Sequence, residues 1–450
     1  MPDTDADSVL IQSPPAVPRS MQAVVMHARG GPEVLLYDTV PTPLPGPGEV
    51  LVRVHAATVN HTDLFHRSGR FFIQKDLPHI LGMDVSGEIA ALGDGVKGWA
   101  AGDRVVATFE ALGRERNGAY AEFTTVPAEH LHRIPDDLDS IAAAAIGLAF
   151  TTAWIALIDN GGLIGRDRVV VNAASSGVGT AALQIARWKG ARTIAISDSQ
   201  KAKRLANLGA DHVLDRHAPD LPDEVMELTG NKGATLVLNQ VGGATVQKSI
   251  AMLGRNGRIV CVGTLGGDKA EIDVMDLLMK NAAIKGSFGQ IAREDFDTIL
   301  RLFANGTFQP VIDSVWGLRS AAYAHELIEN QEAFGKVVLV PVLPGDDGHW
   351  AREASVPFDA RLQAAHPARR LVKGFESGGG VYASEADGRW YLIYDDRTFS
   401  GEFDEEEAIN LQRRTMTVAE FDRPIDRERY FREKGWGSLK ESERIWAGRG

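Results

Sequence analysis

One stretch, residues 169–179, constrains this chain more than any other. Its sequence, VVVNAASSGVG, begins with three β-branched residues that predict a strand buried on both faces. Small residues then separate the strand from the helical pattern of AALQIARWKG, and such a turn lets a pyrophosphate approach backbone N–H groups at a helix N-terminus. Ala174 and Ser176 replace the first two glycines of a GxGxxG pattern, and Gly179 is kept. The stretch alone is therefore also compatible with a turn that binds nothing.

Strands and helices alternate after this turn. ARTIAIS and DHVLD predict strands on either side of the helical SQKAKRLANLGA, and ATLVLNQVGG, GRIVCVGTLGG and AAIKGSFGQ predict three more. The spacing is that of βαβ units of about 30 residues. Because several strands end in Gly-rich loops, the open backbone lies at one edge of a parallel sheet, where such sheets bind ligands. The pattern predicts a doubly wound dinucleotide-binding fold.

Composition restricts the class of protein. A chain of 450 residues has room for two or three domains. The net charge of −12 argues against nucleic acid or an anionic membrane as a partner. The single cysteine, Cys261, excludes an internal disulfide and a cysteine-based structural zinc site, and its place in the strand IVCVG predicts packing in the core.

Two segments test whether the chain is targeted to a membrane. Residues 1–20 carry acids and four prolines without an apolar core, which predicts a disordered leader and not a signal peptide. Residues 141–158 are apolar but interrupted by Gly147, Thr151 and Thr152, which predicts two buried helices near a domain junction and not a membrane span. We therefore expect a soluble, cytoplasmic protein.

The segment before residue 140 is rich in predicted strands. MQAVVMHA, GEVLVRVHAATVN, VSGEIAALG and GDRVVATF are short strand patterns separated by Gly and Pro. After the last strand of the parallel sheet come a helix (EDFDTILRLFANG), a short strand near residues 311–315, a helix (SAAYAHELIEN) and the strand GKVVLVP.

The order of these parts resembles the medium-chain dehydrogenase/reductase superfamily, in its zinc-independent quinone oxidoreductase branch. NAASSGVG and LNQVGG are also similar to the 2-enoyl thioester reductases of that superfamily. The resemblance covers residues 21–341 and implies an α/β fold. A GroES-like β-barrel catalytic domain would span residues 21–140 and 291–342, and a Rossmann doubly wound parallel sheet residues 141–290. It also implies a substrate cleft between them and a homodimer formed through the last two Rossmann strands.

The resemblance points to a site without a metal. Zinc-dependent members hold zinc with a Cys and a His-Glu pair, and the matching positions here are Asn60, Met83 and Asp84. Two of these side chains are poor zinc ligands. A metal site built from the nearby histidines is one alternative, and the other is that these histidines are solvated or pack in the core. We expect no metal. These histidines are His61, His66 and His79.

Three residues are candidates for the chemistry. Asn60 matches an asparagine near the nicotinamide in the quinone oxidoreductases, and its amide is expected to hold the carboxamide or the substrate carbonyl. Thr62 matches the proton-relay hydroxyl of the alcohol dehydrogenases. Phe71, followed by Phe72, stands where the enoyl thioester reductases carry a tyrosine, and a phenyl ring cannot donate a hydrogen bond. Asp63 is expected to cap this turn.

The resemblance also assigns a cofactor site. NAD-specific members place an Asp at the end of the second strand, where Ile196 or Ser197 falls here, with Asp198 slightly further on. Lys201 and Arg216 match positions beside the 2′-phosphate, so we expect NADPH. The pyrophosphate turn would be formed by Ala174, Ser176, Gly177, Val178 and Gly179. The nicotinamide half would be lined by Thr152, Asn239, Gly242, Gly263, Thr264 and Phe288.

The resemblance ends near residue 341, and residues 343–450 match no family that we know. GGGVYASEADGRWYLIYDD predicts a hairpin that turns at residues 386–388, and DEEEAINLQRR predicts a short helix. A small α+β module is expected. It is open whether the module packs on the parent chain, contacts a second subunit, covers the cleft or binds a protein partner.

The sequence therefore favours an NADPH-dependent, zinc-free reductase of a small-molecule quinone, enone or similar activated alkene. Three alternatives remain: a 2-enoyl thioester reductase, a metal-free carbonyl or alcohol dehydrogenase, and a non-catalytic NADPH-binding scaffold that acts through its C-terminal module.

Overall fold

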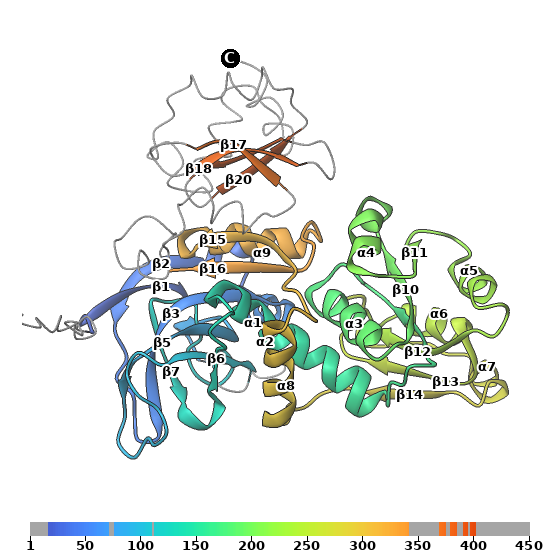
Figure 1. Cartoon of the computed structure of the whole chain (residues 1–450), viewed down its shortest axis with the longest axis horizontal. Coiled ribbons are helices and arrows are strands. Elements are labelled where there is room, and N and C mark those ends of the chain that lie inside the picture. Colours follow the sequence, from blue (N-terminus) through green and yellow to red (C-terminus); the bar gives the residue numbers. More distant parts are fainter. Residues whose placement is uncertain are drawn as a thin grey trace, which may run out of the picture.

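The computed structural model describes residues 17–71, 76–109 and 112–341, together with four strands between residues 369 and 401. The body of the chain forms two units, with the long helix α2 (Ser140–Trp154) running between them (Figure 1). One unit is rich in antiparallel strands, and the other is a parallel sheet with helices. This arrangement is the α/β fold class that the sequence predicts.

The first unit contains two sheets. Their strand orders are β2-β1-β4 and β15-β16-β3-β5-β6-β8, and β7 also pairs with β3. Strand β16 comes from the end of the body but pairs antiparallel with β3, so the returning chain completes this unit as expected. The strands are β1 (Ser20–Met26), β2 (Leu35–Pro41), β3 (Glu49–Val59), β4 (His79–Ile80), β5 (Asp84–Leu92), β6 (Arg104–Thr108), β7 (Phe123–Pro127), β8 (His132–Arg133), β15 (Ile312–Gly317) and β16 (Lys336–Val340); the helices are α1 (His61–Ser68), α8 (Arg293–Ala304) and α9 (Ala321–Glu329).

The second unit is a six-stranded parallel sheet with the order β11-β10-β9-β12-β13-β14. Strand β9 lies in its centre, and its three valines are fully buried, as the β-branched run predicts. The strand order reverses between β9 and β12, which is where such sheets bind ligands. The elements are β9 (Arg168–Val171), α3 (Gly177–Trp188), β10 (Arg192–Ser197), α4 (Ala202–Leu208), β11 (His212–Asp215), α5 (Leu221–Leu228), β12 (Ala234–Asn239), α6 (Thr245–Met252), β13 (Leu253–Cys261), α7 (Val274–Met279) and β14 (Ala283–Gly286).

The apolar run of residues 141–158 is buried between the two units. Helix α2 is broken at Gly147, which has φ −18° and ψ −112°, and it continues as a π-helix over Ile155–Asn160. The stretch Ser140–Asn160 is long and apolar enough to cross a membrane, but 78% of its most apolar window is buried inside the protein. The run therefore forms two helical segments at a domain junction, as predicted.

The described part of the chain starts slightly earlier than the predicted boundary at residue 21. Val17 packs against the core of the first unit, and the carbonyl of Arg19 accepts a hydrogen bond from the N–H of Thr42 at 3.1 Å. The fold therefore includes the last residues assigned to the leader. The rest of the predicted leader, residues 1–16, lies outside the described residues.

The C-terminal strands form a separate antiparallel sheet with the order β17-β18-β19-β20 (orange to red in Figure 1). Strands β18 and β19 pair as the predicted hairpin requires, while its turn at residues 386–388 and the predicted helix DEEEAINLQRR lie outside the described residues. The four strands are β17 (Arg369–Gly374), β18 (Gly379–Ser384), β19 (Trp390–Tyr394) and β20 (Arg397–Gly401).

Candidate functional site

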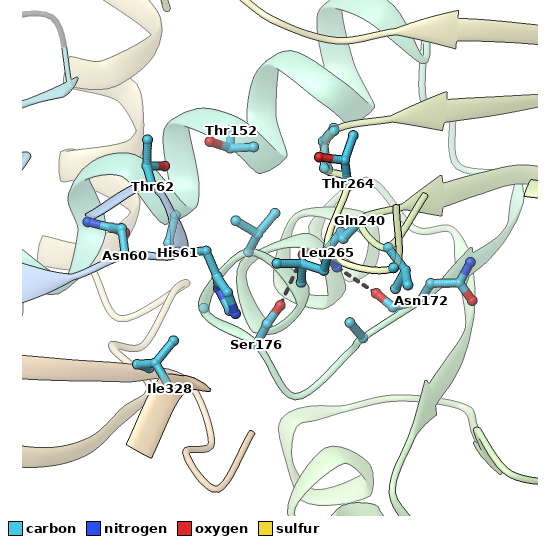
Figure 2. Close-up of a pocket in the computed structure, with 18 of the residues that line it drawn as sticks. Asn60, His61, Thr62, Thr152, Asn172, Ser176, Gln240, Thr264, Leu265 and Ile328 are labelled. Atoms are coloured by element: carbon cyan, nitrogen blue, oxygen red, sulfur yellow. Dashed lines mark hydrogen bonds between the residues drawn. The ribbon is translucent and has the colours of Figure 1, made fainter. Parts of the chain in front are cut away.

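A cleft with a volume of about 1290 Å³ lies between the two units. Its walls come from α1 and α2, from the turn before α3, and from the carboxyl ends of the parallel strands. Figure 2 shows Asn60, His61 and Thr62 on one side of this cleft and Ser176, Gln240 and Thr264 on the other. The volume exceeds that of most sites for small ligands, so a dinucleotide and a substrate fit together.

The turn that begins α1, residues 60–63, is held from inside by Asp63. One carboxylate oxygen of Asp63 accepts the N–H of Asn60 at 2.9 Å, and the other accepts the N–H of Gly82 at 3.1 Å. The side chain is fully buried, and burial raises the pKa of Asp63 to about 7 against the lowering effect of these two donors. The prediction that Asp63 caps this turn is confirmed.

Both the nitrogen and the oxygen of the Asn60 side-chain amide form hydrogen bonds. Its nitrogen donates to Asp84 Oδ2 at 2.9 Å, and its oxygen accepts from Lys336 Nζ at 2.5 Å. The amide oxygen is therefore already paired. The second amide N–H makes only long contacts of 3.5 Å, to the carbonyl and the hydroxyl of Thr58, and a carbonyl of cofactor or substrate would have to replace them. Lys336 was not a candidate from the sequence.

The positions that match zinc ligands form a different kind of site. Asn60 and Asp84 are bonded to the Lys336 ammonium, and Met83 is fully buried outside the cleft lining. Among the described residues, no group of three or more His, Cys, Asp or Glu side chains is placed to hold a metal ion.

Thr62 and His61 line the cleft beside Asn60. Figure 2 shows His61 between this turn and Ser176. Burial and the positive charge of Lys336 lower the pKa of His61 to about 4, so its ring is neutral near pH 7. Neutral His61 and the Thr62 hydroxyl are therefore both weak donors, and the lowered pKa of His61 does not decide between them.

Phe71 forms part of the apolar wall. Its ring lies 4.1 Å from the ring of His66, centre to centre, and it lines the cleft. Phe72 lies outside the described residues. Tyr120 is fully buried away from the cleft, and its hydroxyl lies 3.1 Å from Nε2 of the buried His325.

The turn before α3 presents backbone to the cleft. Ser176 caps the helix by accepting the N–H of Gly179 at 3.0 Å, and its hydroxyl donates to Gln240 Oε1 at 3.0 Å (Figure 2). Gln240 also donates to the carbonyl of Asn172 at 2.6 Å, so it ties the turn to the end of β9. Gln240 lies in the quoted motif LNQVGG, but only the structure shows this bond.

Close packing explains the small residues of this turn. A Cβ at Gly179 would lie 2.4 Å from the carbonyl oxygen of Ala173, so only glycine fits there. Ser176, Gly177 and Val178 line the cleft, whereas Ala174 and Gly179 lie behind it. The structure therefore brings three of these five candidates to the surface of the cleft.

The candidates expected around the nicotinamide also fall into residues that line the cleft and residues that lie behind it. Thr152, Gly263, Thr264 and Phe288 line the cleft, and Asn239 and Gly242 do not. Asn239 is fully buried, and its side-chain oxygen accepts the N–H of Gly242 at 2.8 Å, so it shapes the loop after β12. Cys261 is only partly buried: it packs on the core as predicted but also lines the cleft.

Phe288 is the most exposed of these candidates. It is 68% exposed, and its ring meets that of Phe109 edge to face at 5.9 Å between centres. Phe109 ends β6 in the first unit, so this pair spans the two sides of the cleft.

Three predicted residues gather at the far end of the cleft: Ser197, Lys201 and Arg216. Lys201 Nζ donates to the carbonyls of Gln331 and Ala333 at 2.7 and 2.9 Å, and burial lowers its pKa. Arg216 Nε donates to Asp198 at 2.7 Å. A cofactor phosphate or ribose would therefore meet two cations and one carboxylate.

Gln331 is a further residue that sequence reasoning missed. Its side-chain oxygen accepts a hydrogen bond from Arg216, and it lines the cleft beside His217. Gln331 lies on a loop of the returning segment, 115 residues from Arg216 in sequence. No short motif contains both residues, so the sequence alone does not indicate this contact.

Comparison with known proteins gives two family models. Residues 46–136 match the alcohol dehydrogenase GroES-like domain, and residues 177–305 match the domain described as zinc-binding dehydrogenase. The second stretch covers every strand of the parallel sheet except β9 and contains none of the positions that match zinc ligands.

Relatives match the body of the chain over nearly their whole length. The quinone oxidoreductase of Sus scrofa is 31% identical over 328 residues, which cover 71% of this chain and 98% of that protein. A solved NAD-dependent alcohol dehydrogenase is 39% identical with a TM-score of 0.67, covering 71% of this chain and 99% of its own. A mycobacterial protein solved in complex with NADPH is 32% identical with a TM-score of 0.64, covering 71% and 100%.

Proposed function

Because this chain belongs to the medium-chain dehydrogenase/reductase superfamily and is a nicotinamide-dependent oxidoreductase, we propose that it reduces quinones or enones with NADPH and without zinc. The observation that carries the proposal is the cluster of Lys336, Asn60 and Asp84. A lysine ammonium occupies the place between two positions that match zinc ligands. A conjugated acceptor accepts hydride without a Lewis acid, so this donor set suits it.

The turn before α3 and the far end of the cleft fit NADPH. Backbone at Gly177 and Val178 lies at the N-terminus of α3, where a pyrophosphate is stabilised. Lys201 and Arg216 would hold the 2′-phosphate, with Asp198 keeping Arg216 in place. Bound NADPH supplies the hydride that reduces the acceptor.

The wall beside Thr62 suits a flat, apolar acceptor. Leu64, Phe65, Phe71 and Phe109 line it and offer no hydrogen-bond donor. The Thr62 hydroxyl lines this side. It would donate a hydrogen bond to the carbonyl oxygen on which charge develops and then relay to it a proton that solvent supplies, so that the hydroxyl is restored. The missing tyrosine at Phe71 disfavours the 2-enoyl thioester alternative.

The test follows NADPH absorbance with the full-length protein against a quinone, an enone and a 2-enoyl thioester, with NADH in parallel and with alcohol plus NADP⁺ as the reverse assay. We expect turnover of the quinone or enone, preference for NADPH, and no effect of a chelator. Thr62→Val should lower kcat, while Thr307→Val at an exposed position after α8 is the matched control. Chelator-sensitive alcohol oxidation would overturn the proposal in favour of a dehydrogenase, and cofactor binding without turnover in favour of a scaffold.

We also propose that the chain forms a homodimer through the edge of the parallel sheet. Strand β14 lies at that edge with all its residues exposed, and α7 beside it exposes Met275, Leu278 and Met279. A protein partner for the C-terminal module remains a separate hypothesis.

A further inference from the structure

Lys336 begins β16 and lies almost completely buried at the junction of the two units, with a side chain that is 6% exposed. Its ammonium donates to Asn60 Oδ1 at 2.5 Å and lies 3.4 Å from both the carbonyl of Val59 and Asp84 Oδ2. All three ammonium protons therefore have acceptors around the catalytic turn.

Asp84 is the matching anion, and it is fully buried. Its Oδ1 accepts from Thr108 Oγ1 at 2.6 Å and from the N–H of Leu148 at 2.7 Å. Its Oδ2 accepts from Asn60 Nδ2 and from Thr58 Oγ1. With so many donors, this carboxylate is held as an anion that Lys336 balances.

These two charges determine the orientation of the Asn60 amide. The amide oxygen faces the ammonium, and the amide nitrogen faces the carboxylate. A flipped amide would place NH₂ against the ammonium and its oxygen against the carboxylate, which are both repulsive. The amide of Asn60 therefore has one orientation, with one N–H toward Asp84 and the other 3.5 Å from the Thr58 carbonyl.

The stem of Lys336 reaches the cofactor turn as well. A Cβ at Gly177 would lie 2.7 Å from Lys336 Cδ, so the stem packs directly on the first residue of α3. The neighbouring Gly335 donates its N–H to the carbonyl of Ser175 at 2.8 Å. One side chain thus touches the pyrophosphate turn and the residue expected beside the nicotinamide.

From this geometry we infer that Lys336 is a positioning residue for hydride transfer: its ammonium fixes the amide of Asn60, and its stem sets the distance between that amide and the cofactor turn. The inference rests on the proposed reductase function. A merely structural lysine would only balance Asp84. Because Asp84 also holds the Asn60 nitrogen, the two roles are separated by comparing the double variant with D84N, which lacks the same carboxylate but keeps Lys336.

The experiment uses three variants of the full chain, K336M, D84N and the double variant D84N/K336M. A double variant that matches D84N in hydride transfer and in Asn60 exchange would also overturn the inference. The double variant keeps both shapes and leaves no unpaired buried charge, so it is expected to fold even where K336M does not. K97M, at an exposed lysine in the β5–β6 loop, is the control. Single-turnover hydride transfer, NADPH affinity by fluorescence and the side-chain ¹⁵N resonance of Asn60 are measured for each protein.

We expect the double variant to bind NADPH within about threefold of wild type, to transfer hydride about 10–100-fold more slowly, and to show faster solvent exchange of the Asn60 amide. K97M should match wild type in all three. A double variant with wild-type transfer and a protected Asn60 amide would overturn the inference and leave Lys336 as a structural counter-ion.

The amide resonance separates this inference from the proposed function. A wild-type protein that transfers no hydride to any acceptor refutes the reductase. In that case, unchanged amide exchange in the double variant refutes the role of Lys336, and faster exchange supports its control of Asn60.

Discussion

Replacing Gly147 by alanine tests the link between the break in α2 and the buried carboxylate of Asp84. An ideal Cβ at Gly147 would lie 2.1 Å from Asp84 Oδ1 and 2.7 Å from its Cγ. The next residue, Leu148, donates its N–H to that same oxygen at 2.7 Å. Alanine must therefore displace either the carboxylate or the helix, and both movements break this hydrogen bond.

Two terms give the magnitude. Forcing an extra methyl group into a packed interior costs about 1–3 kcal/mol. Losing a hydrogen bond to a buried charged group costs about 1.5–3 kcal/mol more. Gly147→Ala should therefore destabilise the protein by about 3–5 kcal/mol, a large part of the net stability of a typical protein, and lower Tm by about 5 °C for a chain of this length.

The assay compares urea midpoints and Tm of wild type, Gly147→Ala and the control Gly46→Ala, where a Cβ would meet only the side-chain carboxylate of Glu49, at 3.3 Å. The control should lie within about 0.5 kcal/mol of wild type. Hydride transfer should also slow in Gly147→Ala, because Asp84 orients Asn60. A Gly147→Ala protein as stable as the control would refute the assignment of this break to the Asp84 contact.

Arg216→Ala should lower kcat/KM about tenfold with NADPH and little with NADH in steady-state assays, since a 2′-phosphate loses a charged donor; equal losses would contradict NADPH preference. Ile284→Lys on the exposed edge strand should give monomers in sedimentation velocity, and an unchanged mass would locate the dimer contact elsewhere. Burial raises the pKa of Asp63 to about 7, so the folded chain retains a proton that the unfolded chain releases near pH 4. From pH 5 to 8 the free energy of unfolding of wild type should therefore fall by roughly 3 kcal/mol relative to that of Asp63→Asn. Urea midpoints of the two proteins that stay parallel across this range would argue against the raised pKa of Asp63.

The sequence predicts what depends on local patterns. The valines of β9, the small residues before α3 and the break at Gly147 are each visible in a short window, because strand burial, turn chemistry and helix interruption are local effects. The capping role of Asp63 is visible for the same reason, since it lies three residues after Asn60.

Long-range partners are not visible in this way. Lys336 bonds a residue 276 positions away, and nothing in GKVVLVP separates a buried ammonium from an ordinary strand lysine. Gln240 and Gln331 are likewise polar residues whose roles follow from what folding brings beside them. The bond between the Asn60 amide oxygen and Lys336 could not be predicted from the sequence for the same reason.

The returning segment 331–336 connects both ends of the cleft. At the far end its carbonyls accept from Lys201, in the middle Gly335 bonds Ser175, and at the catalytic turn Lys336 bonds Asn60. A short, nearly continuous piece of backbone therefore contacts the groups expected at the 2′-phosphate, the pyrophosphate and the nicotinamide.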